Sequence, residues 1–127
     1  MCIRDRGKTT CAFFRPGTDQ ILFASTHHDP KSKQYQDEEL AFRASGKERR
    51  YAWDYDPEME IYTYSEGTKS LTRITNVRGY DAEAGYSPDG QWIVFSSTRT
   101  GYDHTLTEAE QKQLATDASW FGEIYTV

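Results

Sequence analysis

The sequence is poor in cysteine and has no long apolar run, and each absence excludes a class of protein. Its two cysteines, Cys2 and Cys11, are too few for the disulfide framework of a small secreted domain. No apolar run approaches the length needed to cross a bilayer, so we expect no transmembrane segment. The formal net charge of −5 argues against a nucleic-acid partner, because phosphate binding needs a basic surface.

The sequence also lacks a complete catalytic or metal-binding motif. Ser87 lies in GYSPDG, which departs from the nucleophile elbow because Pro88 follows the serine and no glycine stands two residues after it. His27 and His28 are adjacent at the end of a predicted strand, where they would point to opposite faces rather than to one zinc ion. We therefore predict no catalytic residue, no cofactor and no bound metal within this sequence.

Two stretches of the chain repeat one another. FRPGTDQILFASTHHD (Phe14–Asp29) aligns without a gap with YSPDGQWIVFSSTRTG (Tyr86–Gly101), 72 positions further on (14 to 86). A second pair, EIYTY at Glu60–Tyr64 and EIYTV at Glu123–Val127, is 63 positions apart (60 to 123). A repeat whose ends match while its middle differs in length is typical of a structural unit with unequal loops.

Each unit contains the signals of short antiparallel strands. The run Trp92–Ser97 is β-branched and aromatic, is too short to predict a helix, and follows a turn at Pro88–Gly90. Glu60–Tyr64 and Leu71–Thr75 are further predicted strands, joined by a hairpin loop that contains Gly67. Four strands joined in chain order predict the blade of a β-propeller, and therefore an all-β fold.

These motifs resemble the WD-like repeat of the TolB-like β-propellers. The resemblance is carried by YSPDGQWIVFSSTRTG, by EIYTV and by SLTRIT, which is similar to the closing strand of that repeat. It implies a periplasmic or secreted module that presents a binding surface to a protein or peptide partner in the bacterial cell envelope. The chain departs from the simple repeat between His27 and about Glu58, where a long link replaces a short loop.

The repeat divides the chain into three predicted segments. Residues 1–9 are expected to form a head outside the fold, and Met1–Gly7 resembles translated sequencing-adapter read-through at the start of a metagenomic gene fragment, with a disordered native terminus as the alternative. Residues 10–81 are predicted to form a first blade with an insertion at 28–58, and residues 82–127 a second, incomplete blade. Propellers close with about four to eight blades, so we expect the rest of the propeller to lie in a longer protein.

The long links carry helical signals. Lys31–Gly46 has a helix-favouring composition and ends on a glycine, where a C-terminal cap belongs. Thr107–Glu110 reads TEAE and predicts a capping box that opens a helix through about Thr116. We expect both helices on the rims of the blades, either as partner-binding surfaces or as loops without a role.

Burial can also be predicted for a few positions. Cys11 is expected to be a small buried hydrophobic residue at the start of a strand, and Tyr51 and Trp53 are expected to face the core. The last predicted strand, Glu123–Val127, has no closing partner in the sequence and would have an unpaired edge.

Carboxylates at two places are the candidate channel-lining or partner-binding residues. Asp54 and Asp56 alternate with other residues, so an extended backbone would place them on one face, as a binding edge or as a solvated surface. Asp81 and Glu83 lie in the strand that lines the channel of a propeller, and they would share a face able to bind a cation or a basic peptide. The alternative is that Asp81 caps a turn at the blade junction.

Three functions remain open on these observations. The leading prediction is a non-catalytic TolB-like propeller that binds a protein or ligand in the envelope. The alternative is the propeller domain of a larger peptidase or hydrolase, of α/β-hydrolase or zinc-aminopeptidase type, which gates access to an active site outside this sequence. A third, metal-assisted hydrolysis at the channel mouth, requires Asp81 or Glu83 to bind a divalent ion. A fold does not fix a function, so the site must decide.

Overall fold

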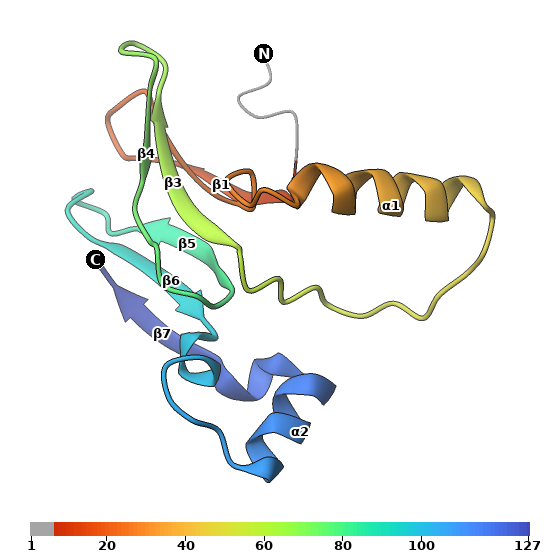
Figure 1. Cartoon of the computed structure of the whole chain (residues 1–127). Helices are drawn as coiled ribbons and strands as arrows, with labels where there is room; N and C mark the ends of the chain where they lie inside the picture. Colours follow the sequence, from red (N-terminus) through yellow and green to blue (C-terminus); the bar gives the residue numbers. More distant parts are fainter. Residues whose placement is uncertain (1–6) are drawn as a thin grey trace.

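The computed structural model describes residues 7–127, and its strands form two antiparallel sheets (Figure 1). Residues 1–6, most of the predicted head, lie outside the described residues. The first sheet has the order β1-β2-β3-β4 and comprises β1 (Thr9–Phe14), β2 (Gln20–Ser25), β3 (Glu60–Ser65) and β4 (Ser70–Arg73). The second has the order β5-β6-β7 and comprises β5 (Asp81–Tyr86), β6 (Ile93–Ser97) and β7 (Glu123–Thr126). The prediction of an antiparallel β fold is confirmed.

The two sheets repeat one another in their strand pairing. Thr9 pairs with Ser25 in the first sheet as Asp81 pairs with Ser97 in the second. Of the remaining pairs, Thr10–Ala24 in the first sheet corresponds to Ala82–Ser96 in the second, Phe13–Leu22 corresponds to Gly85–Val94, and Phe14–Ile21 corresponds to Tyr86–Ile93. In both sheets the register shifts at the same place along the first strand, so the sequence repeat corresponds to a structural repeat.

The end of the predicted head, residues 1–9, belongs to the first sheet. Thr9 is the first residue of β1. The backbone of Lys8 exchanges bonds with Thr26, because the Lys8 carbonyl accepts from the Thr26 N–H at 3.0 Å and the Lys8 N–H donates to Thr26 Oγ1 at 3.0 Å. The fold therefore begins before the predicted boundary at residue 10.

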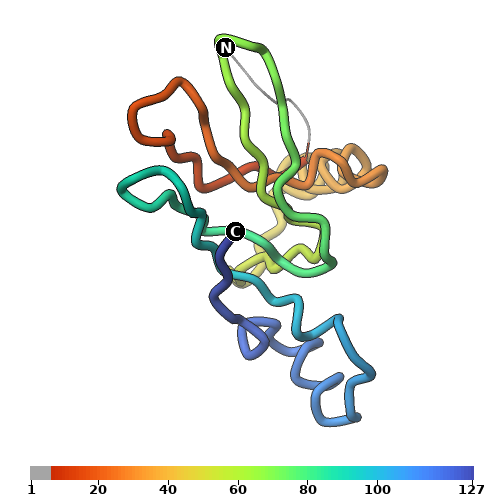
Figure 2. Tube along the Cα trace, turned by 90° about the vertical axis from the view of Figure 1, so that its left-hand side faces the viewer, coloured from red at the N-terminus to blue at the C-terminus, as the bar shows by residue number. Residues whose placement is uncertain are grey.

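One buried cluster joins the two sheets. Leu22, Ala24 and Ile61 of the first sheet and Ile93 and Phe95 of the second belong to it. Leu22 and Ile61 are fully buried, and truncation of such a side chain to alanine costs about 2–5 kcal/mol. The sheets lie one above the other in both views (Figures 1 and 2), so this cluster fixes how one unit packs on the next.

The turn between β5 and β6 has the predicted chemistry. Gly90 has φ 69°, a left-handed conformation that glycine adopts without strain. The Asp89 carboxylate accepts from the Gln91 N–H at 3.1 Å, and Ser87 Oγ accepts from the Trp92 N–H at 3.0 Å. Ser87 is therefore a turn residue, as its sequence context indicates.

Both predicted helices are present in the links. α1 (Ser32–Ala44) lies between β2 and β3, and Gly46, with φ 68°, follows its last turn as the predicted C-terminal cap. α2 (Glu108–Thr116) begins with the predicted capping box between Thr107 and Glu110. Two short 3-10 helices, η1 (Arg99–Gly101) and η2 (Ala118–Phe121), flank the α2 link. Among the described residues, no helix has the length and apolarity that a membrane span needs.

α1 and the returning segment form an arm beside the sheets (Figure 1). The arm consists of α1 and residues 45–58, and the second half runs back to β3 without regular structure. Only Ser32 is buried in α1, so the helix is exposed on nearly all sides. The insertion predicted at residues 28–58 therefore adds a surface rather than a second core.

Candidate functional site

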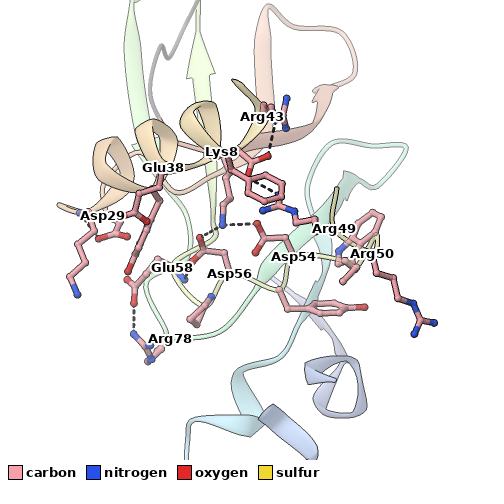
Figure 3. Close-up of a pocket in the computed structure, with 18 residues that line it drawn as sticks. Lys8, Asp29, Glu38, Arg43, Arg49, Arg50, Asp54, Asp56, Glu58 and Arg78 are labelled. Atoms are coloured by element: carbon pink, nitrogen blue, oxygen red, sulfur yellow. Dashed lines mark hydrogen bonds and ion pairs between the residues drawn. The ribbon is translucent and has the colours of Figure 1, made fainter. Parts of the chain in front are cut away.

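A cavity lies between the two halves of the arm (Figure 3). It has a volume of about 1080 Å³ and is lined by charged side chains of both signs together with Tyr35, Phe42, Trp53 and Tyr55. The aromatic residues can contact apolar groups of a ligand, and the charged residues can form ion pairs with it. The cavity is therefore the candidate binding site of this chain.

Lys8 connects the arm to the first sheet. Its Nζ lies 2.6 Å from Asp54 Oδ2 and 2.7 Å from Asp56 Oδ2, so both predicted carboxylates point toward one cation (Figure 3). Burial by itself lowers the pKa of Lys8, but the hydrogen bonds and charges of the two carboxylates raise it overall. Asp54 and Asp56 are thus brought together as expected, while their partner lies in the segment that the sequence placed outside the fold.

Tyr51 and Trp53 do not face the core, and that prediction is wrong. Tyr51 is 81% exposed and Trp53 is 54% exposed. Residues 47–56 form no strand or helix, so no neighbouring strand fixes which face their side chains take. Trp53 Nε1 donates to Tyr80 Oη at 3.2 Å, and the indole is part of the cavity lining.

Glu58, also on the cavity wall, contacts Arg78 and His28. Its carboxylate forms an ion pair with Arg78, and its Oε2 lies 3.7 Å from His28 Nε2. Burial lowers the pKa of His28, and the charge of Arg73 lowers it further. Both effects favour the neutral imidazole over the charged one, and the ring also forms a hydrogen bond with a tyrosine hydroxyl.

The tyrosine that binds His28 is Tyr62, and both His27 and His28 contact it. The hydroxyl of Tyr62 lies 2.9 Å from His28 Nδ1, and the ring of His27 lies 4.3 Å from that of Tyr62. The prediction that the two imidazoles point to opposite faces is wrong, because β2 ends at Ser25 and the histidines lie in a turn. Within residues 7–127, no group of three histidine, cysteine or acidic side chains could hold a metal ion.

Asp81 and Glu83 do not share a face. The side chain of Asp81 is fully buried, with Oδ2 2.8 Å from Arg99 Nη2 and Oδ1 2.5 Å from Ser97 Oγ. Glu83 is exposed, has φ 50°, and accepts from the Tyr80 hydroxyl at 2.8 Å. A bulge in β5 between Ala82 and Gly85 breaks the alternation of side chains on which the prediction depended. Asp81 also caps no turn, because its partners are Ser97, opposite it on β6, and Arg99.

Glu60, which the sequence did not place among the candidate site residues, is the most buried acidic residue after Asp81 in the described part of the chain. It is 2% exposed, and its Oε1 lies 2.7 Å from Arg73 Nη2. Its Oε2 accepts from Thr75 Oγ1 at 2.5 Å. Burial raises the pKa of Glu60, although the bonds from Thr75 and Arg73 act in the opposite direction. The repetition of EIYT at residues 60 and 123 was the available signal, because it keeps a charged residue inside a strand motif.

Cys11 differs from its prediction too. It is half-buried and free, and it lies at the bulge of β1 with φ 54°. Its conformation follows from the bulge, which turns the residue out of the regular pleat.

Part of the chain is similar to a known bacterial protein. The chain is 39% identical over 56 residues to the uncharacterized protein Atu1656 of Agrobacterium fabrum (strain C58 / ATCC 33970). The match covers 44% of this chain and 19% of the relative, so the chain spans about a fifth of the length of the protein it matches. No family model matches the chain. No solved structure matches it.

Proposed function

We propose that the chain forms two units of a TolB-like β-propeller that serves as a non-catalytic scaffold for a protein or peptide partner in the periplasm or outside the bacterial cell. The observation that carries this proposal is the repeated register of the two sheets, with a bulge at the same position of β1 and β5. Units that repeat in this way and pack only on their neighbours are typical of propellers and other repeat proteins.

The packing between the sheets supports the same reading. Leu22 and Ile61 of the first sheet are fully buried in the cluster that joins it to the second. Val94 and Ile124 occupy the equivalent positions in the second sheet and are 43% and 71% exposed. A head-to-tail contact uses different faces of the two partners and can continue to a further unit. Val94 and Ile124 therefore form the surface on which a third sheet would pack.

The arm supplies the proposed binding surface. It projects from the sheets, and its cavity is lined by aromatic and charged side chains. The exposed Trp53 is part of the cavity lining, and the exposed Tyr51 lies in the same arm. Exposed aromatic residues on a loop that a rigid scaffold positions are typical of partner-binding sites. We assign the partner to peptides or proteins because the cavity offers charges of both signs rather than a single charged group.

The test uses the full-length protein whose gene contains this sequence. An affinity-tagged form is compared with a variant in which residues 45–58 are replaced by a glycine-serine linker, and both are used to capture proteins from envelope extracts. Circular dichroism of the two forms controls for folding. We expect the native arm to enrich specific proteins that the linker variant loses. Equal capture by both forms contradicts a binding role for the arm.

The alternative proposal, a propeller that gates a peptidase or hydrolase, has its own measurement. The full-length protein is incubated with chromogenic peptide and ester substrates. A scaffold gives no hydrolysis above a heat-denatured control. Hydrolysis that persists when residues 45–58 are replaced places the active site elsewhere in the protein and supports the alternative.

A further inference from the structure

In the first sheet, the edge of the third strand, β3, that faces away from β2 is covered by β4 and the residues after it. β4 lies beside β3, with Arg73 opposite Tyr62. The chain beyond β4 continues the contact, because the Ile74 N–H donates to the Ile61 carbonyl at 2.8 Å and Thr75 Oγ1 accepts from the Ile61 N–H at 2.9 Å. Both backbone groups of Ile61 are therefore satisfied by the two residues that directly follow β4.

The same segment, β4 and the two residues after it, also binds a buried carboxylate. Arg73 Nη2 lies 2.7 Å from one oxygen of Glu60, and Thr75 Oγ1 donates to the other at 2.5 Å. Arginine and threonine two positions apart thus bind the two oxygens of one carboxylate, and Glu60 is left 2% exposed. The Arg-x-Thr sequence occurs at residues 73–75 and at no other place in the chain.

β7 pairs with β6 in the same way as β3 pairs with β2. Glu123 pairs with Ser97 as Glu60 pairs with Ser25. The rings of Phe95 and Tyr125 stack at 5.9 Å, and those of Phe23 and Tyr62 at 5.8 Å. β7 is therefore equivalent to β3 on the side that pairs with the preceding strand, and Glu123 occupies the position of Glu60.

The outer side of β7 differs, because no strand within residues 7–127 pairs with it. Ile93 and Val127 exchange N–H···O bonds of 2.8 and 2.9 Å, and such pairs alternate along antiparallel strands. The N–H and C=O groups of Ile124 consequently face the outer edge. Ile124 is 71% exposed and Glu123 is also exposed, whereas Ile61 and Glu60 are buried.

We propose that the outer edge of β7, together with the Glu123 carboxylate, binds a β-strand that carries Arg-x-Thr. The arginine pairs with one oxygen of Glu123, and the threonine hydroxyl binds the other oxygen and the N–H of Ile124. This inference rests on the repeat that underlies the proposed function, and it adds the residues that recognise the next strand.

The occupant is a later segment of a longer protein rather than a second copy of this chain. The relative from Agrobacterium is matched over only 19% of its length, so a protein of this kind has chain available to supply the strand. A second copy would have to take the strand from its own first sheet, because Arg73–Thr75 is already paired with β3 and Glu60.

The test extends the chain after Val127 with a copy of Ser65–Thr75, since Val127 corresponds to Tyr64 in the repeat. Amide hydrogen exchange at Ile124 is measured by NMR in the extended and unextended chains. We expect the extension to slow exchange at Ile124 by about tenfold or more. Unchanged exchange overturns the docking edge. Protection in the unextended chain that grows with protein concentration identifies a second copy as the occupant and also overturns the proposal.

Recognition of Arg-x-Thr is tested separately from strand addition. Replacement of the copied arginine by alanine, or Glu123→Gln, is expected to reduce the protection of Ile124, and the two changes together are expected to cost no more than one alone. Additive effects overturn the pairing. The matched control is Glu108→Gln, which lies on exposed α2 and leaves the protection unchanged.

A second measurement applies if the extended chain does not fold. In the full-length protein we expect Ile124 to be as protected as Ile61, and fast exchange at Ile124 overturns the proposal. Neither measurement involves an envelope partner or a substrate. Failure of the docking edge is therefore distinguishable from failure of the scaffold function, which the capture experiment tests.

Discussion

Cys11 and Glu83 occupy the same position in their two sheets, 72 residues apart (11 to 83), and both have a left-handed backbone. Their φ angles are 54° and 50°, and each lies where the register of the first strand shifts. A non-glycine residue in this conformation is uncommon, so its recurrence at equivalent positions is a property of the repeated unit. The bulge turns the first strand of each sheet, and it separates the buried Asp81 from the exposed Glu83.

Cys11→Gly is expected to stabilise the protein. A left-handed residue with a Cβ costs about 1–2 kcal/mol, part of which is offset because glycine loses more entropy on folding. We expect the free energy of unfolding to rise by up to about 1 kcal/mol in urea denaturation. Cys11→Ala keeps the Cβ and removes the thiol, so it is the control and should give no gain. Equal stabilisation by both variants would show that the thiol, not the backbone, is the unfavourable group.

Asp81→Ala is expected to destabilise the protein strongly. Asp81 is fully buried and forms an ion pair with Arg99, whose side chain is 19% exposed. Removal of one partner leaves the other charge unpaired, at a cost of about 3–5 kcal/mol. Thermal and urea denaturation measure the loss, and Asp103→Ala, at an exposed site, is the control with little effect. A loss of less than about 1 kcal/mol contradicts the role of the ion pair in holding η1 against β5.

The stability of the protein is expected to fall as the pH drops below the ordinary pKa of His28. Burial holds the pKa of His28 below its usual 6.5, so the unfolded state binds a proton more readily than the folded state in this range. The contribution of His28 is fully present above pH 6.5 and is lost as the pH falls through its folded pKa. Urea denaturation between about pH 7 and pH 5 measures the slope. His28→Gln should flatten it, and an unchanged slope assigns the pH dependence to other groups.

Thr107→Ala is expected to weaken α2. The Thr107 hydroxyl accepts from the Glu110 N–H at 3.3 Å, and the Glu110 carboxylate accepts from the Thr107 N–H at 2.8 Å. Loss of such a cap costs about 1 kcal/mol. Hydrogen exchange in residues 108–116 should become faster, while Thr105→Ala, at an exposed neighbouring position, should have no effect. Equal exchange in both variants contradicts the capping role.

The elements that depend on local chemistry were predictable from the sequence. The turn at Pro88–Gly90 and the capping box at Thr107 use interactions within a few residues, and the structure contains both. The strands Glu60–Tyr64 and Trp92–Ser97 were predictable because β-branched and aromatic runs between turns leave few alternatives. The expectation that the strands of one unit are joined in chain order then predicted that consecutive strands pair, as they do in both sheets.

The parts that depend on long-range pairing were not predictable. Lys8 binds Asp54 and Asp56, more than forty positions away, and no local signal assigns it to the fold. The bulge at Glu83 depends on its pairing with β6, so the strict alternation assumed from the sequence failed there. Residues 47–56 have no strand partner, and Trp53 therefore remains exposed despite its apolar ring.

The most direct test of the central claim is an experimental structure of the full-length protein that contains this sequence. We predict further four-stranded sheets around a common axis, with β1 and β5 innermost, a strand paired to the outer edge of β7 and a third sheet packed on Val94 and Ile124. A full-length structure in which the two sheets form a closed two-layer sandwich, with the edge of β7 and both of these side chains in solvent, would contradict the propeller.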